Sequence, residues 1–275
     1  MEYSNTLPLT RLAATLAAAA GVEPPRLAEE KIDGLAETLK EKAGPDGIDR
    51  VVIYNPDAIA RWLFQKYAGE FAPVLRHAQT AVEFQTVFPP VTPVCFASMY
   101  TGTKPAVHGI RKYEKPVVTT DSLFDALIRA GKKTAIVSVR GCSMSKIFLE
   151  KDMDYFIMDC DEAVCEKAVE LIEKDTYDFL SVYTQDYDSL MHLTGTESEI
   201  ALNAMRSQID IFRKIAEAVD ASYKKHNTLL GFCTDHGVHN NENGAGKHGE
   251  DIPEDRNITH FFGVKARSKF VTFRA

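Results

Sequence analysis

The fold of this chain is decided by a short apolar run that ends in a carboxylate: Val51-Val52-Ile53-Tyr54-Asn55-Pro56-Asp57. Four consecutive apolar residues followed by Asn-Pro indicate a strand buried on both faces, as in parallel sheets. A helix is expected directly after it, at residues 58–67. Asp57 would then lie just beyond the carboxyl end of the strand, where open α/β sheets form their sites. An Asp after a strand is more often a helix N-cap, so Asp57 gains weight as a site residue only from the other residues.

Strands and helices continue to alternate along the rest of the chain. Further strands are predicted at residues 134–139, 155–158, 179–183, 229–233 and 261–264, and helices at residues 122–130, 162–173 and 197–223. Such alternation predicts an α/β fold, with a doubly wound, mostly parallel sheet and helices on both faces.

Length and composition favour one domain. The chain has 275 residues, of which 45% are hydrophobic, and this is enough to bury a substantial core. We expect residues 1–275 to form one domain, with a peripheral helical segment at residues 1–48. Its helices are predicted at residues 10–20 and 25–42. Residues 111–155 are the candidate region for a small cap over the site.

Charge and cysteine content narrow the functional classes. The net charge of −7 and a pI near 5.7 argue against a partner that is a nucleic acid polymer, because such proteins neutralise many phosphates. Five cysteines, none in a CxxC pair, are typical of reduced thiols in a cytosolic protein. No signal peptide or membrane span is recognised, so we expect a cytoplasmic location and no membrane partner.

Thr92 stands at the predicted start of a helix. The following Pro93 is favoured in the first helical turn, so Thr92 is predicted as the N-cap. A hydroxyl at this place lies beside unpaired N–H groups and the positive end of the helix dipole, which together favour a phosphate. By itself, however, the pattern favours a simple helix cap.

Two pairs of acidic and histidine side chains follow predicted strands. Asp188 and His192 are four residues apart, so one helical turn would place both on the same face, where they could bind one ion. Asp186 is a competing ligand. Asp235 and His236 are adjacent at a strand end and precede a glycine, so both side chains can reach a metal while the backbone turns away.

The remaining histidines divide into candidate ligands and structural residues. His248 lies in a glycine-rich loop, where little else would hold it, and His239 is the alternative ligand in this region. His108 and His260 are expected to be turn and core residues. Mixed carboxylate and imidazole donors favour zinc, although manganese or iron would suit them as well.

Taken together, these residues resemble the alkaline phosphatase superfamily, and within it the type I phosphodiesterase/nucleotide pyrophosphatase branch. The resemblance covers residues 57–264 and leaves out the first fifty. Its matching residues are Thr92 with Thr101-Gly102, Pro105 and His108-Gly109-Ile110, then Asp188, His192, Thr234-Asp235-His236-Gly237 and His248-Gly249.

The resemblance implies an alkaline phosphatase-like fold with two divalent metal ions, expected to be zinc, or else manganese or iron. The implied ligands are Asp57, Asp235 and His236 for the ion that activates the nucleophile, and Asp188, His192 and His248 for the ion that activates water. Thr92 is implied as the nucleophile that attacks phosphorus and forms a phosphothreonine, which water then hydrolyses.

One departure from the family concerns substrate binding. In that branch an asparagine shortly after the His-Gly-Ile triplet helps to hold a phosphate oxygen, but here Arg111-Lys112-Tyr113 follows the triplet. Tyr113 is the expected counterpart, and Arg111, Lys112 or Lys115 could supply the donor or charge instead. The Cys/Ser-x-Pro-x-Arg motif of the sulfatase branch is absent, so that branch is disfavoured.

The expected function is hydrolysis of phosphodiesters or nucleotide pyrophosphates, with a small phosphorylated substrate. A phosphomonoesterase or phosphonate hydrolase of the same superfamily is the alternative. A second alternative is not an enzyme at all but a non-catalytic scaffold protein that binds metal. The oligomeric state is left open.

Overall fold

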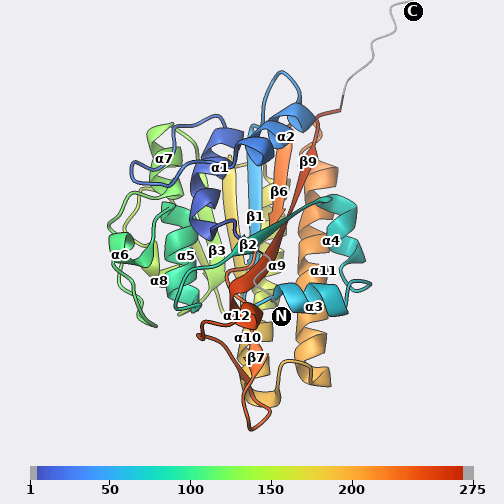
Figure 1. Ribbon diagram of the computed structural model, residues 1–275. Helices are drawn as coiled ribbons and strands as arrows, with labels where there is room; N and C mark the ends of the chain where they lie inside the picture. The colour runs from blue at the N-terminus through green and yellow to red at the C-terminus, as the bar shows by residue number, and fades with distance from the viewer. Residues whose placement is uncertain (1–4, 269–275) are drawn as a thin grey trace, which may run out of the picture.

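A mixed sheet forms the centre of the computed structural model, which describes residues 5–268. In this part of the chain, seven strands lie side by side in the order β2-β9-β6-β1-β5-β3-β4 (Figure 1). Their bounds are β1 (Arg50–Pro56), β2 (Thr80–Gln85), β3 (Thr134–Val139), β4 (Asp154–Met158), β5 (Phe179–Thr184), β6 (Thr228–Phe232) and β9 (Asn257–Lys265). Among these pairs only those of β9, with β6 and with β2, are antiparallel. The predicted mostly parallel sheet is therefore confirmed.

The side chains of β1 show why the sheet has helices on both faces. Val52 and Tyr54 belong to one buried hydrophobic cluster, whereas Val51 and Ile53 belong to another. Successive side chains of a strand point to opposite faces, so a continuous apolar run must be covered on both sides.

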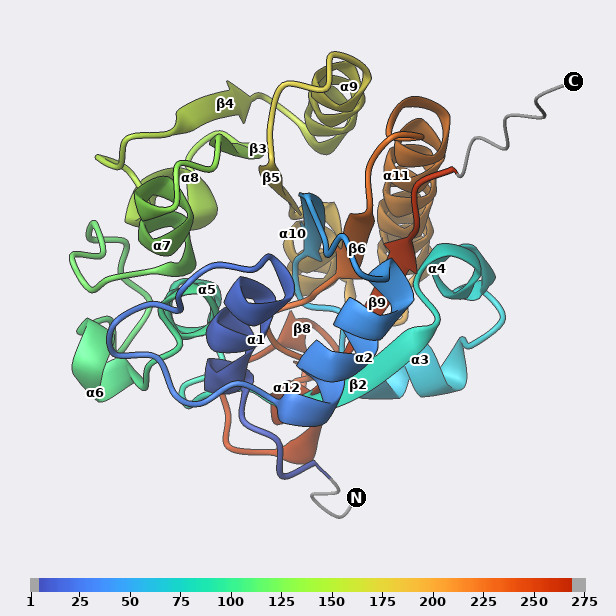
Figure 2. The same cartoon turned by 90° about the horizontal axis from the view of Figure 1, so that it is seen from above.

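Two helical layers provide this cover, and Figure 2 shows them on either side of the strands. The first cluster is covered by α3 (Arg61–Lys66), α4 (Ala72–His77), α9 (Asp161–Glu173), α10 (Asp186–Thr194) and α11 (Glu199–Ser222). The second is covered by η1 (Leu9–Arg11), α1 (Leu12–Ala19), α2 (Asp33–Ala43), α5 (Thr92–Thr101), α7 (Leu123–Arg129) and α8 (Met144–Ile147), with α6 (Pro105–His108) beside α5.

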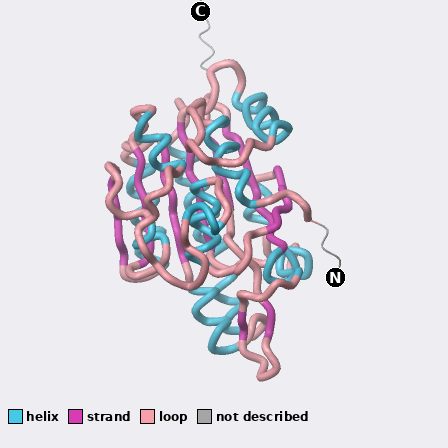
Figure 3. The backbone as a smooth tube through the Cα atoms, turned by 60° about the vertical axis from the view of Figure 1, so that its left-hand side comes forward, coloured by secondary structure: helices cyan, strands magenta, loops and turns pink. Residues whose placement is uncertain are grey.

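A small two-stranded ribbon, β7 (His239–Asn240) with β8 (Gly246–Lys247), projects at the lower end of the molecule in Figure 3, near α12 (Pro253–Arg256). It packs closely on α10. A Cβ added to Gly246 would lie only 2.2 Å from the Sδ atom of Met191, so this contact requires glycine. The ribbon thus holds the loop that follows it, which contains His248, against α10.

The N-terminal segment differs from the prediction. Leu9, Leu12 and Leu16 are fully or almost fully buried in the second cluster, so the segment belongs to a helical layer and is not peripheral. The helix predicted at residues 25–42 begins only at residue 33. Before it, the chain is held in a non-helical course because the Arg11 guanidinium donates to two of its carbonyl oxygens and the Thr15 hydroxyl accepts from a backbone N–H.

Two further regions differ from what the sequence predicts. The sequence analysis did not predict β2, an edge strand whose side chains alternate in burial. Residues 111–155, the candidate cap, include α7, β3 of the central sheet and α8, which belong to the main fold. A cap formed by the remaining loops stays a prediction. Among residues 5–268 no helix combines the length and the apolar character needed to cross a membrane.

Candidate active site

The predicted nucleophile and six predicted ligands come together at the carboxyl ends of the strands. Asp57 follows β1, and Asp235 and His236 follow β6, which pairs in parallel with β1. Parallel strands end at the same edge of a sheet, so these three side chains meet although they are far apart in the sequence. Thr92 opens α5 on the same side, and α10, the helix after β5, carries Asp188 and His192.

The first group consists of Asp57, Asp235 and His236, which are buried. Their potential ligand atoms all lie within 4.8 Å of one another. The Nε2 atom of His236 is 3.5 Å from Oδ1 of Asp57 and 3.2 Å from Oδ2 of Asp235. Neither of these two carboxylate oxygens has a hydrogen-bond partner among the described residues. Because a buried charged oxygen without a partner is costly, this pair suits a divalent cation.

The backbone before α3 supports this first group. Ala58 has a φ of +66°, a conformation that residues other than glycine rarely adopt, and its N–H donates to Oδ1 of Asp235 at 3.1 Å. This explains why the helix predicted at residues 58–67 begins only at Arg61. The turn bends the chain so that Asp57 and Asp235 face each other.

The second group contains Asp188, His236 and His248, whose ligand atoms also lie within 4.8 Å of one another. The Nε2 atoms of His192 and His248 are both 3.5 Å from Oδ1 of Asp188. That oxygen is buried and has no hydrogen-bond partner in the described part of the chain. His236 is therefore shared by both compact groups, and its ring stacks on that of His248 with centroids 4.0 Å apart.

All three predicted histidine ligands are oriented by backbone carbonyl groups. In each, Nδ1 donates to a carbonyl oxygen at 2.9–3.1 Å, which leaves the lone pair of Nε2 directed toward the carboxylates. The pairs are His192 with Gly246, His236 with Gly237 and His248 with Pro90. This is the tautomer that a metal-binding imidazole needs.

Burial controls the charges in the site. It lowers the pKa of His236 and of His248 to about 3, so both imidazoles are neutral near pH 7. Burial also raises the pKa of Asp57 and Asp235, and the nearby carboxylates raise it further. Without a cation, the carboxylate cluster therefore holds on to protons, and a bound cation would reverse this effect.

The structure places Thr92 one position later in its helix than predicted. Val91 is the N-cap, with an extended backbone at φ −131° and ψ 144°, and Thr92 is the first residue of α5. The Thr92 hydroxyl makes no capping hydrogen bond and lies 3.3 Å from Nε2 of His236. Because the hydroxyl is not used as a cap, it is available for chemistry.

Three supporting residues were missed by the sequence analysis. Tyr183 donates its phenol proton to Oδ2 of Asp57, and the Thr86 hydroxyl donates to the carbonyl oxygen of Asp235 at 2.7 Å. Buried Asp255 accepts from the backbone N–H of Glu250 at 2.9 Å and so anchors the loop of His248. Tyr183 could have been found, because it lies opposite residue 55 in the parallel register of β1 and β5.

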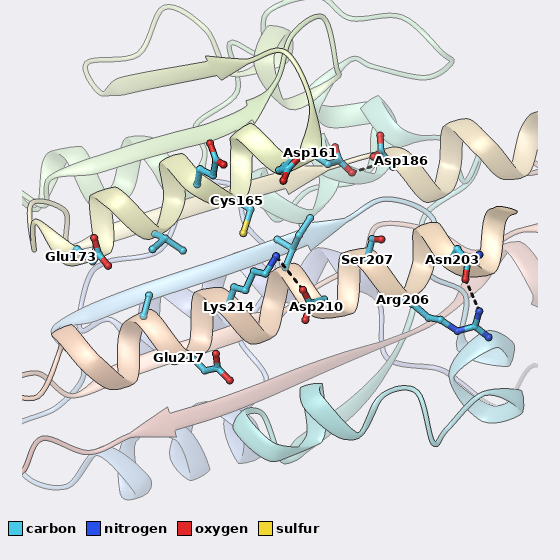
Figure 4. A pocket seen from close by; sticks show the side chains of 15 residues that line it. Asp161, Cys165, Glu173, Asp186, Asn203, Arg206, Ser207, Asp210, Lys214 and Glu217 are labelled. Carbon is cyan, nitrogen blue, oxygen red and sulfur yellow. Dashed lines mark hydrogen bonds and ion pairs between the residues drawn. The ribbon is translucent and has the colours of Figure 1, made fainter. Parts of the chain in front are cut away.

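The alternative ligands lie elsewhere. His239 bonds to Asp255 through Nδ1 at 2.7 Å and belongs to neither compact group, so the structure favours His248. Asp186, also outside both groups, lines a groove between α9 and α11 (Figure 4). His108 and His260 are buried and hydrogen-bonded to Ser98 and to the Thr234 carbonyl, which confirms their expected structural roles.

The predicted substrate-binding residues lie on the surface. Arg111, Lys112 and Tyr113 are exposed, and Tyr113 has an exposed fraction of 63%. Lys112 pairs with Glu114 at 3.7 Å. Within residues 5–268 none of the three is hydrogen-bonded or ion-paired to the seven residues of the site, so their role stays a prediction.

Comparison with known families identifies the chain. Residues 46–265 match the model of the type I phosphodiesterase / nucleotide pyrophosphatase family. The chain belongs to this family. The resemblance to the alkaline phosphatase superfamily is thereby confirmed. A search of curated proteins finds no match.

Solved structures with this fold come from several branches of the superfamily. Murine ectonucleotide pyrophosphatase / phosphodiesterase 5, an inactive variant in complex with AMP, is 14% identical with a TM-score of 0.57 over 71% of this chain and 59% of its own. A 2-O GAG sulfatase is 13% identical with a TM-score of 0.58 over 78% and 64%. Phosphonoacetate hydrolase from Sinorhizobium meliloti 1021, in complex with phosphonoformate, is 16% identical with a TM-score of 0.53 over 70% and 57%. The family member described here thus spans less than two thirds of these proteins, and the likeness is one of fold.

Proposed function

We propose that this protein is a metal-dependent hydrolase of phosphodiesters or nucleotide pyrophosphates that acts through a phosphothreonine intermediate. The observation that carries the proposal is the convergence of three buried carboxylate oxygens without partners, from Asp57, Asp188 and Asp235, beside the hydroxyl of Thr92, which is hydrogen-bonded to His236. Membership of the type I phosphodiesterase / nucleotide pyrophosphatase family supports the reaction class.

The residues fit two divalent cations. We assign Asp57, Asp235 and His236 to one ion and Asp188, His192 and His248 to the other, with His236 close enough to both for its assignment to need a direct test. When bound, such ions supply positive charge that activates a hydroxyl or water and offsets the charge of the phosphoryl group. Zinc is the proposed metal, and manganese or iron would suit the same donors.

The residues of the chain have distinct tasks in the proposed reaction. The Thr92 oxygen bonds to phosphorus while the bond from phosphorus to the leaving oxygen breaks, and the hydroxyl proton passes by way of solvent to the leaving oxygen. Water then cleaves the phosphothreonine and restores the hydroxyl. The positive end of the dipole of α5, at Thr92, favours the negative phosphoryl group throughout. Tyr183 and Ala58 keep the carboxylates of Asp57 and Asp235 in place.

A small phosphorylated molecule is the proposed substrate. Two proteins with this fold were solved with AMP and with phosphonoformate. A phosphomonoesterase or phosphonate hydrolase is the second candidate, because Arg111, Lys112 and Tyr113 follow the triplet where the family has an asparagine and could serve a more highly charged group.

Parallel assays with p-nitrophenyl phosphate and bis-p-nitrophenyl phosphate would test the proposal, using protein stripped of metal and reloaded with zinc or manganese. We expect a preference for the diester. A preference for the monoester would favour the second candidate. If the protein binds metal but hydrolyses neither substrate, this result would favour a phosphonate substrate or a non-catalytic scaffold.

Thr92→Ala tests the nucleophile. Hydrolysis should fall by at least about 10³-fold, because the covalent step is lost, while the metal content stays at the wild-type value. Thr92→Ser is the matched control, since it keeps a hydroxyl and should retain measurable turnover. Unchanged turnover by the alanine variant would show that another group attacks phosphorus.

A cytosolic location remains part of the proposal. All five cysteines lie in the described part of the chain and none is paired, and this supports a reducing compartment.

A further inference from the structure

The helix that carries Asp188 and His192 lacks an N-terminal cap of its own. The N-cap residue of α10, Gln185, makes no capping hydrogen bond with its side chain. The first N–H groups of any helix have no partner within the helix and need an acceptor from elsewhere, particularly when they are buried. The acceptor for α10 decides how firmly its first turn is held.

That acceptor is the carboxylate of Asp161, which comes from another helix. Its two oxygens accept from the backbone N–H of Gln185 at 3.0 and 3.1 Å, and Oδ2 also accepts from the N–H of Asp186 at 2.9 Å. The Asp161 residue is only 3% exposed. Figure 4 shows Asp161 beside Asp186, joined by a dashed line.

The position of Asp161 is electrostatically unusual. It is the first residue of α9 and caps α10, so its carboxylate lies at the positive ends of two helix dipoles. Burial and the neighbouring carboxylate of Asp186 raise the pKa of Asp161 to about 6, while the backbone N–H groups lower it. The carboxylate is therefore mainly ionised near pH 7, and its hydrogen bonds to α10 are charge-assisted.

The surroundings argue against a role in neutralising positive charge. Asp161 lies in the lining of an open groove of about 1040 Å³ between α9 and α11, which holds both acidic residues and the cations Arg206 and Lys214. Within residues 5–268 these two cations pair with other carboxylates, and the partners that hold the Asp161 carboxylate are backbone N–H groups at the start of α10.

We propose that Asp161 is a positioning residue for the metal site: by capping α10 from α9, it holds Asp188 and His192 in the place where they meet His248. The inference rests on the proposed function, which gives these residues their role. Asp188 is only two residues beyond Asp186 and is followed one helical turn later by His192. A shift of the first turn would move both ligands together, whereas Asp57 and Asp235 follow strands of the sheet and would stay in place.

Replacement of Asp161, with metal affinity as the readout, tests this role. Asp161→Ala removes the cap, and Asp161→Asn keeps one acceptor oxygen but loses the charge. Glu162→Gln is the matched control, because it removes a charge from the same turn of α9 and the same groove and bonds to no described residue of α10. We expect Asp161→Ala to bind one of two ions about 10-fold to 100-fold more weakly in a competitive titration with a zinc chelator. The second ion should bind as in the wild type.

Hydrogen exchange of the α10 amides provides a second readout that needs no metal. Exchange at residues 185–188 should be faster in metal-free Asp161→Ala than in the wild type and in Glu162→Gln, with Asp161→Asn between them. If Asp161→Ala does not fold, the asparagine variant supplies the comparison.

Metal affinity and hydrogen exchange together distinguish a failure of the positioning role from a failure of the proposed function. Unchanged affinity for both ions overturns the positioning role, even if the melting temperature falls, because a lower melting temperature alone would show only a structural cap. Absence of metal binding by the wild type would contradict the proposed function instead, and the exchange data would still decide whether Asp161 holds α10.

Discussion

The two halves of the site are built in different ways. In the sheet-borne half, Asp57, Asp235 and His236 follow strands, and their side chains are at most 2% exposed. In the helix-borne half, Asp188 and His192 lie on α10 and His248 lies in a loop, with side-chain exposures of 17%, 40% and 7%. Paired strands hold the first half, whereas hydrogen bonds and close contacts from outside its own elements hold the second.

The sheet-borne half is therefore buried and rigidly held, whereas the helix-borne half is more accessible to solvent. In the sheet-borne half, burial and nearby carboxylates raise the pKa of Asp57 and Asp235, so these groups retain protons that a bound cation would displace. The helix-borne half depends on Asp161 at one end of α10, on Asp255 under the loop and on the close contact of Gly246 with Met191. It is therefore the half that substitutions at a distance should weaken first.

The largest effect is expected in the sheet-borne half, from Asp235→Asn. Loss of the charge removes a proposed metal ligand next to the proposed nucleophile, so kcat/KM should fall on the order of 10³-fold. In the metal-free protein, the same change removes repulsion among buried carboxylates and should leave the free energy of unfolding unchanged or raised. Urea denaturation in the presence of a chelator measures the latter, and a large loss of stability would contradict the account of this half.

A smaller effect is expected in the helix-borne half, from His192→Ala. One ion should bind about 10-fold to 100-fold more weakly, while the other stays bound. The free energy of unfolding should change by less than about 0.5 kcal/mol, since this side chain is partly exposed. Metal analysis after dialysis, with Leu193→Ala as an exposed control on the same helix, checks the result. Loss of both ions together would mean that the halves are not independent.

A further effect concerns the pH dependence of stability without metal. Asp57 and Asp235 have raised pKa values, so the folded protein keeps protons that the unfolded chain has lost above about pH 4. Below about pH 6.5, the lowered pKa values of His236 and His248 act in the opposite direction, because only the unfolded chain then gains their protons. Buried His108 and His260 also have lowered pKa values and act in the same way as His236 and His248. The effect of the carboxylates therefore dominates only above about pH 7.5, where unfolded imidazoles have lost most of their protons. The raised pKa of His192 acts there with the same sign as the carboxylates.

In that window the metal-free protein should lose stability as the pH rises, by about 1.4 kcal/mol per pH unit for each retained proton. Denaturation curves at pH 7.5, 8 and 8.5 measure the slope. Asp235→Asn should reduce it, and added zinc should abolish it. A metal-free protein whose stability rises with pH in this window would refute the charge assignment for the sheet-borne half.

Much of the fold was predictable because its strands are apolar on both faces. The strand at residues 134–139 was predicted with its observed bounds, since every residue of it is buried. The edge strand β2 was missed, because only residue 84 of it is fully buried and its pairing partner β9 lies more than 170 positions away in the sequence. The prediction of a helix at residues 25–32 was wrong. Arg11 and Thr15 hold the backbone of this segment in a non-helical course, and no local pattern reveals these contacts.

The fold class and the family could be predicted from residue types and their order after predicted strands, and the same pattern nominated the seven candidate residues that the structure brings together. Only the tertiary structure decided which atoms meet. It shows His236 shared between the two groups, the three imidazoles oriented by backbone carbonyl groups, and α10 capped by Asp161. Several of these interactions join distant segments, such as His248 and Pro90 at a separation of 158 residues, so no local pattern could predict them.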